Sequence, residues 1–99
     1  MSQRYALTPE AEEDLIGIFL HGLTTWGRPQ ARQYHGDLHH TFDVLAENPQ
    51  AGRTRSELAA SIRSFPYKAH VIFYVIERDE VIIARILHGA RDIDVLFSR

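Results

Sequence analysis

The stretch Trp26-Gly27-Arg28-Pro29 separates two long segments that both have helical periodicity. Gly27 suits the end of the first segment, because glycine readily adopts the conformation that follows a helix, and Pro29 suits the first turn of the second. Two amphipathic helices joined by about two residues must run antiparallel. The stretch therefore predicts a helical hairpin.

The first helix of this hairpin follows a short strand candidate, Arg4 to Leu7. Thr8-Pro9-Glu10 provides an N-cap, a proline at the first helical position and an acid near the positive end of the helix dipole. We expect Gly22 to cost this helix about 1 kcal/mol relative to alanine, and its second half to fray or bend. The residues expected to face the core are Ala11, Leu15, Ile18, Phe19 and Trp26.

The second helix continues to Asn48-Pro49, where proline ends it. Its predicted inner stripe is Ala31, Tyr34, Leu38, Thr41, Phe42 and Leu45. Residues 50–60 have no strong period and predict a loop, in which Ser56-Glu57-Leu58 could form one turn of helix.

Three strand candidates follow this loop: Ile62 to Phe65, His70 to Glu77 and Val81 to His88. Val71 to Ile76 is apolar on both faces, which is typical of a central strand. Arg78-Asp79-Glu80 predicts a tight turn, and Asp92 to Phe97 allows one short final helix. The order is strand, helix, helix and three strands, which is an α+β fold.

Composition predicts one folded domain over residues 1–99, since 44% of the residues are apolar and 24% are charged. The absence of cysteine excludes disulfides, thiolate zinc sites and cysteine nucleophiles. The start lacks the apolar core of a signal peptide, and Val71 to Ile76 is too short to cross a membrane. We expect a cytoplasmic protein without membrane contact.

Charge is unevenly distributed along the chain. Residues 1–48 contain three arginines and seven acids, whereas residues 49–99 contain eight basic residues and six acids. Lys68 is the only lysine, and arginine suits bidentate pairing with carboxylates or phosphates. The pI of about 6.3 argues against a dedicated nucleic-acid-binding domain.

Four fragments in this order resemble ParE-type toxins of the ParE/RelE superfamily, and the similarity extends from about Tyr5 to Leu96. They are Trp26-Gly27-x-x-Gln30-Ala31-x-x-Tyr34, Asn48-Pro49-x-x-Gly52-Arg53, His70-x-Ile72-x-Tyr74 and Arg85-Ile86-Leu87-His88-Gly89-x-Arg91-Asp92. One departure is the segment from Ser64 to Ala69, which lacks the glycine expected between two strands.

The resemblance implies a helical hairpin on a mostly antiparallel sheet, and a toxin of a type II toxin–antitoxin system that forms a hetero-oligomer with a ParD-like antitoxin. ParE toxins typically inhibit DNA gyrase, whereas RelE relatives cut messenger RNA on the ribosome, and the shared fold cannot decide between them. We favour a gyrase inhibitor that acts by protein binding. This reading includes growth inhibition and plasmid stabilisation, without a cofactor or direct sequence-specific nucleic-acid binding.

The enzymatic alternative is a RelE-like endonuclease, and a third possibility is a member that binds an antitoxin but poisons nothing. RNA cleavage needs a base, cations over the phosphate and an acid. The nearest candidates are His88 as base, Arg63 and Arg85 over the phosphate, and Tyr67 or Lys68 as acid. Ile93 to Phe97 offers no tyrosine or further base, which weakens this reading.

The residues predicted to bind a partner are Arg63, Arg85, His88, Arg91 and Asp92, around the final loop. In a purely structural interpretation, the two strand arginines pair with acids such as Asp92 or Glu77, and His88 closes the last strand by hydrogen bonding. Alternation along the strand places Arg85 on the face opposite His88.

A metal site is not predicted. His35 and His39 have a chelating spacing, but no acidic third ligand has a fixed place near them, and His40 makes a solvated histidine-rich face the better interpretation.

Overall fold

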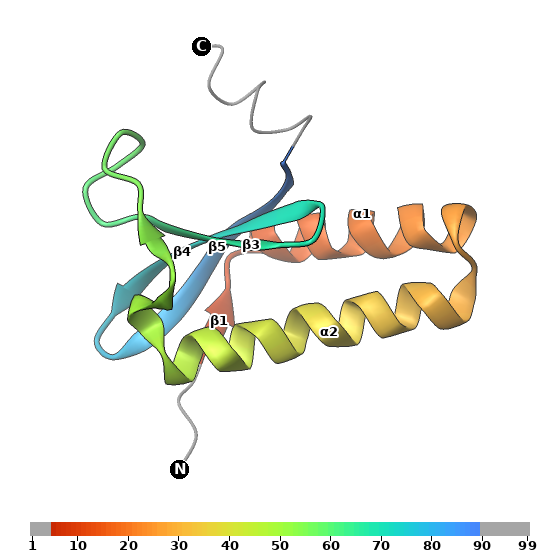
Figure 1. Ribbon diagram of the computed structural model, residues 1–99, viewed down its shortest axis with the longest axis horizontal. Coiled ribbons are helices and arrows are strands. Elements are labelled where there is room, and N and C mark those ends of the chain that lie inside the picture. The colour runs from red at the N-terminus through yellow and green to blue at the C-terminus, as the bar shows by residue number, and fades with distance from the viewer. Residues whose placement is uncertain (1–4, 90–99) are drawn as a thin grey trace.

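The computed structural model describes residues 5–89. Its elements are β1 (Tyr5–Leu7), α1 (Pro9–Thr25), α2 (Arg28–Glu47), the 3₁₀ turn η1 (Pro49–Ala51), β2 (Arg53–Thr54), β3 (Arg63–Tyr67), β4 (His70–Glu77) and β5 (Glu80–His88). The predicted α+β order is confirmed, and the two helices lie side by side as a hairpin (Figure 1). Strand β2 was not predicted, because it lies in the segment expected to be a loop. The predicted final helix, with Arg91 and Asp92, lies outside the described residues.

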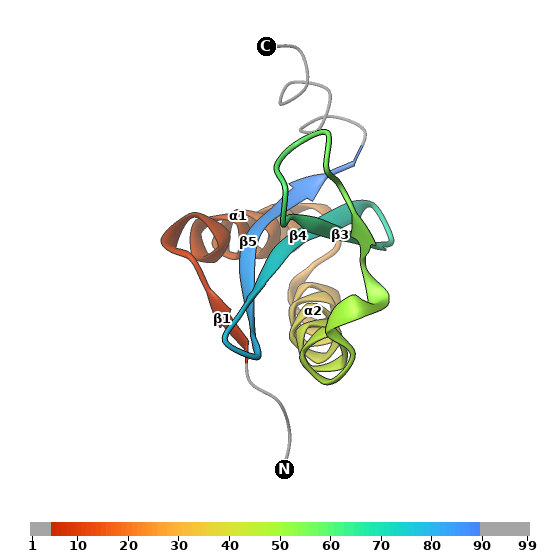
Figure 2. The ribbon, with the colours of Figure 1, turned by 90° about the vertical axis from the view of Figure 1, so that its left-hand side faces the viewer.

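The sheet has the strand order β1-β5-β4-β3-β2, so the apolar strand β4 is central as predicted. β1 runs parallel to β5, and the other neighbours are antiparallel. Figure 2 looks along the two helices and shows the twisted sheet beside them. A bulge shifts the β4–β5 register, so that Phe73 pairs with Arg85 but Tyr74 pairs with Ile83.

The core lies between the hairpin and one face of the sheet. Side chains of both predicted helical stripes meet Ile72, Tyr74, Ile83 and Ile86 there. Leu38 and Phe42 are completely buried, which confirms the inner face of α2. Trp26 was wrongly placed in the core: it is the residue after the last turn of α1, and 41% of it is exposed.

Gly22 does not cause the expected fraying, because α1 continues to Thr25. Its role is to allow a close approach. A Cβ at this position would lie 3.1 Å from both the Trp26 ring and the Ala31 Cβ. The hairpin then turns at Gly27, whose φ of +97° few other residues adopt.

The two hairpin turns of the sheet use residues other than glycine at positive φ. Arg78 and Asp79, at +51° and +65°, form the predicted turn between β4 and β5. Between β3 and β4, Lys68 takes the left-handed conformation at a φ of +54°, where a glycine was expected. A lysine in this conformation costs about 1 kcal/mol.

Candidate functional site

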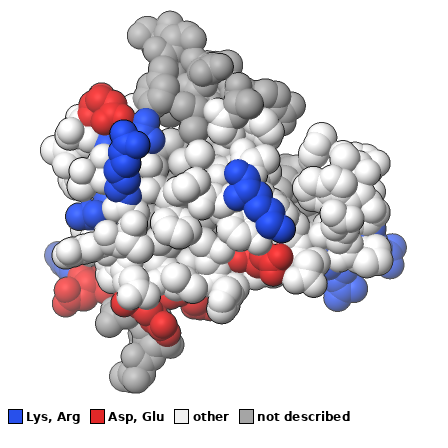
Figure 3. All heavy atoms as spheres, viewed as in Figure 1, with Lys and Arg blue, Asp and Glu red and all other residues white. Residues whose placement is uncertain are grey.

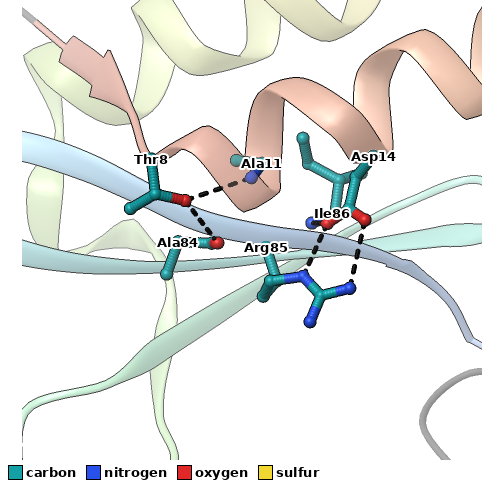
Figure 4. Close-up of polar contacts among 6 residues, drawn as sticks. All are labelled: Thr8, Ala11, Asp14, Ala84, Arg85 and Ile86. Carbon is teal, nitrogen blue, oxygen red and sulfur yellow. Dashed lines mark hydrogen bonds and ion pairs between the residues drawn. The ribbon is translucent and has the colours of Figure 1, made fainter.

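The start of α1 forms hydrogen bonds with the backbone of β5 beyond the point where the short strand β1 ends. Thr8 donates from its backbone N–H to Ile83 O at 3.0 Å and from its hydroxyl to Ala84 O at 2.8 Å. Further along, the Ile86 N–H donates to the carboxylate of Asp14 at 2.9 Å. The first turns of the helix therefore replace a missing stretch of neighbouring strand (Figure 4).

Arg85 is held at this same edge. Its guanidinium donates to both carboxylate oxygens of Asp14, at 2.8 and 3.1 Å (Figure 4). Arg85 thus pairs with an acid, as the structural interpretation expects, and the acid within the described residues is Asp14 of α1. The pair orients the arginine and ties α1 to β5.

The turn after α2 is held against the sheet by a second set of contacts, formed around Tyr74. The Tyr74 hydroxyl accepts from the Gly52 N–H at 2.8 Å and donates to Pro49 O at 2.6 Å. A Cβ at Gly52 would clash with the Tyr74 ring. Arg63 donates to Gly52 O at 2.7 Å, and burial raises the pKa of Tyr74. The fragments containing Gly52 and Tyr74 thus form one packed unit.

A cavity of about 360 Å³ lies between the hairpin tip, the β3–β4 turn and the end of β5. We call it the tip pocket. Its lining residues are His21, Trp26, Gln30, Gln33, Tyr34, Asp37, Lys68, Ala69, His70 and His88. Tyr34 Oη lies 2.7 Å from His70 Nδ1, and the His70 and His88 rings are in edge contact with centroids 5.6 Å apart.

Two aromatic rings and one amine complete the tip pocket. The Tyr34 ring packs on those of Trp26 and Tyr67, and Lys68 Nζ is 5.8 Å from the Tyr34 ring centroid. Burial, with a smaller contribution from Tyr67, raises the pKa of Tyr34 to about 12. Tyr34 is therefore a neutral hydrogen-bonding group at physiological pH.

The structure divides the residues proposed for a nuclease. His88 and Lys68 share the tip pocket, and Tyr67 packs beside it, but Arg63 and Arg85 bind Gly52 O and Asp14 elsewhere. Sequence reasoning missed His70 and Tyr34 as members of this site. The sequence did not indicate His70, because the bulge that shifts the β4–β5 register is what brings it opposite His88.

A larger cavity, about 620 Å³, lies between the two helices near β1. We call it the hairpin groove, and its lining residues are Leu7, Glu12, Leu15, Ile16, Phe19, Arg32, His35, Gly36 and His39. Ile16 is 60% exposed beside it, and Leu20, one turn further along α1, is 55% exposed. Exposed large aliphatic residues next to an apolar groove are typical of interaction sites.

Histidines form one wall of the hairpin groove. The His35 and His39 rings are in tilted contact with centroids 4.7 Å apart, and His39 Nδ1 lies 2.8 Å from Tyr5 Oη. Burial, and secondarily the neighbouring His35, lowers the pKa of His39. In residues 5–89, no cluster of three or more His, Cys, Asp or Glu side chains could hold a metal ion.

Charge and hydropathy add two observations about the described residues. Basic side chains on the face shown in Figure 3 form small separate groups and not one continuous patch. No helix within the described range is long and apolar enough to cross a membrane.

A family model described as "ParE toxin of type II toxin-antitoxin system, parDE" matches residues 5–93. This chain belongs to the ParE toxin family. It is 36% identical to Toxin ParE1 of Mycobacterium tuberculosis over 95% of this chain and 97% of that toxin. It is 35% identical to Toxin ParE1 of Caulobacter vibrioides over 85% and 86% of the two chains. The resemblance to ParE toxins seen in the sequence is confirmed.

The ParE fold is also found in a solved structure, titled "Chromosomal ParDE TA system from P. aeruginosa". The TM-score is 0.75 and the match covers 88% of this chain and 96% of that one, at 19% identity. This likeness supports the architecture. In this ParE-family chain, several motif residues, among them Gly52, Tyr74 and Arg85, build the fold.

Proposed function

We propose that this ParE-family toxin inhibits DNA gyrase by binding it, and that a ParD-like antitoxin neutralises the toxin by forming a hetero-oligomer with it in the cytoplasm. Family membership supports both partners. The observation that carries the protein-binding reading is the hairpin groove, with Ile16 and Leu20 exposed beside it. Burial of such aliphatic side chains is the main source of free energy in protein association.

The antitoxin is proposed to place an amphipathic segment in the hairpin groove. Its apolar side would cover Ile16 and Phe19, and Glu12 and Arg32 at the groove offer charges for complementary side chains. Acids elsewhere in the antitoxin would meet the basic half of the chain, including the predicted partner residues Arg63, Arg85, His88 and Arg91. Asp92, in the same set, stays a prediction.

A binding mechanism is favoured over catalysis by the arrangement of the arginines. Arg85 donates to Asp14 and Arg63 donates to a backbone carbonyl, so both arginines have structural partners within the fold. Phosphate stabilisation in RNA cleavage requires cations at the same site as the base. In the endonuclease alternative, the candidates that remain at the tip pocket are Lys68, Tyr67 and the histidines.

The test is supercoiling of plasmid DNA by purified gyrase with and without the purified toxin. We expect loss of supercoiling and accumulation of linear DNA after denaturation, both prevented by prior addition of the antitoxin. Unchanged supercoiling at concentrations that arrest growth would contradict the proposal. Cleavage of ribosome-bound messenger RNA, abolished by His88→Ala in a folded variant, would establish the enzymatic alternative.

A further inference from the structure

Trp26 presents a fixed aromatic ring at the mouth of the tip pocket. Its backbone N–H donates to Gly22 O at 2.8 Å, and its ring fits into the space that the missing Cβ of Gly22 leaves. The Trp26 ring also packs against the ring of Tyr34, and the two ring centroids are 5.5 Å apart. The ring is thus held by packing although 41% of the residue is exposed. A rigid, exposed aromatic face is a stacking platform.

The opposite wall of the tip pocket carries hydrogen-bond donors and the only lysine of the chain. Lys68 holds its left-handed conformation at a position where glycine would be unstrained, and its amine lies 5.5 Å from the Tyr67 ring centroid. His70 and His88 line the same pocket. Strained residues other than glycine concentrate at functional sites, and an amine in one pocket with two imidazoles suits an anion such as phosphate.

We propose that the tip pocket binds one nucleotide, with its base on the Trp26 ring and its phosphate at Lys68, His70 and His88. The cavity of about 360 Å³ has the size of a small-ligand site. Gln30 supplies an amide for the edge of the base. The Asp37 carboxylate accepts from Gln33 Nε2 at 3.0 Å, and because like charges repel, the phosphate is placed at Lys68 and not at Asp37.

The charge distribution favours a single nucleotide over a long nucleic acid. The net charge is −2, and the basic groups on the face in Figure 3 are separated, whereas strand binding needs a continuous basic track. An acidic peptide could pair with Lys68, but it would offer a ring to Trp26 only where it carries an aromatic residue, whereas every nucleotide carries both groups. The tip pocket is also independent of the hairpin groove, since their linings share no residue.

The experiment follows the single indole N–H resonance of Trp26, the only tryptophan, in the ¹⁵N-labelled full-length protein. The probes are adenosine and guanosine monophosphates, the corresponding nucleosides, inorganic phosphate, and a 5′-phosphorylated single-stranded oligonucleotide. We expect saturable shifts with the monophosphates at much lower concentrations than with phosphate or nucleosides. If the oligonucleotide binds more tightly, the natural ligand is the end of a nucleic-acid strand. If the free monophosphate binds more tightly, the natural ligand is a small molecule.

Three variants separate binding from folding. Lys68→Gly removes the amine and the strained conformation, so it should weaken monophosphate binding by about tenfold or more without lowering the Tm. Lys68→Arg should retain binding, and Arg53→Gln, an exposed arginine of β2, should not change it. The proposal is overturned if no shift saturates, if Lys68→Gly binds like the wild type, or if an acidic peptide displaces the monophosphate more strongly than phosphate does.

Discussion

The two sides of α2 carry two different kinds of site. One side contributes Arg32, His35, Gly36 and His39 to the hairpin groove, and the other contributes Gln30, Gln33, Tyr34 and Asp37 to the tip pocket. Neighbours in sequence separate in this way because the helical period of 3.6 residues turns consecutive positions to different faces. The groove is bordered by exposed aliphatic residues and suits a protein segment. The pocket has an aromatic platform and an amine, and suits a small anion.

The comparison also shows which motif residues do not discriminate between partners. Gly52 and Tyr74 hold the turn after α2 against the sheet, and Asp14 and Arg85 hold α1 against β5. These contacts support both sides of α2 through the shared core. Substitutions of these four residues should therefore affect both the hairpin groove and the tip pocket. Substitutions on one side of α2 should affect only the site on that side.

The largest effect is expected from Gly52→Ala, which disrupts the contact between Gly52 and Tyr74. The new Cβ would clash with the Tyr74 ring and disturb the hydroxyl that accepts from the Gly52 N–H. Overpacking of this kind should lower the free energy of unfolding by about 3 kcal/mol, as measured by urea denaturation. Gly17→Ala is the matched control: nothing lies within 4 Å of its Cβ, so it should stabilise α1. Equal free energies of unfolding for the two variants would contradict a stabilising role of the Gly52–Tyr74 contact.

An intermediate effect is expected from Asp14→Asn. The substitution removes the charge that pairs with Arg85 and weakens the acceptor for the Ile86 N–H, but Arg85 is partly exposed and solvent screens the pair. We expect a loss of about 1 kcal/mol in the free energy of unfolding and faster amide exchange at Ile86. Glu13→Gln, at the exposed neighbouring position, is the control. Unchanged amide exchange at Ile86 would show that contacts other than Asp14 protect this N–H.

The smallest effect concerns pH and should be confined to the groove side. Because burial lowers the pKa of His39 below its ordinary value of 6.5, the unfolded chain binds a proton that the folded chain does not. This contribution to stability is complete above pH 6.5 and is lost as the pH falls from there toward the folded pKa. His39→Asn should therefore flatten the fall in Tm between neutral and acidic pH.

The control for this pH dependence is His40→Asn, at the exposed next position of α2. The relevant quantity is the difference between the two variants in their Tm profiles from neutral to acidic pH. Identical profiles would exclude a specific contribution from His39.

Local patterns in the sequence were sufficient for the helices and long strands, because capping residues and apolar spacing act over a few neighbours. β2 was missed because two paired residues leave no period. Trp26 was misassigned because its spacing continues the stripe of α1 beyond the last helical turn at Thr25. Ile16 is not part of the predicted inner stripe of α1, so periodicity could not show that this position borders a groove.

The candidate sites depended on contacts between distant residues. His88 was predicted, but its pairing with His70 depends on the β4–β5 register, and the Asp14–Arg85 pair joins residues 71 positions apart. The helical spacing of α2 gave the inner stripe correctly. Only the packing of α1 and the β3–β4 turn on either side of α2 showed which of its other residues share a site.

The most direct test of the account is the affinity of the toxin for the proposed ParD-like antitoxin, compared between Ile16→Glu and Ile76→Glu. Both isoleucines are exposed, but only Ile16 lines the hairpin groove. We predict that Ile16→Glu weakens binding in calorimetry by about thirtyfold or more, the loss expected at a hot spot, while Ile76→Glu binds nearly like the wild type and both remain folded. Undiminished binding by folded Ile16→Glu, or an equal loss in both variants, would contradict the hairpin groove as the antitoxin site.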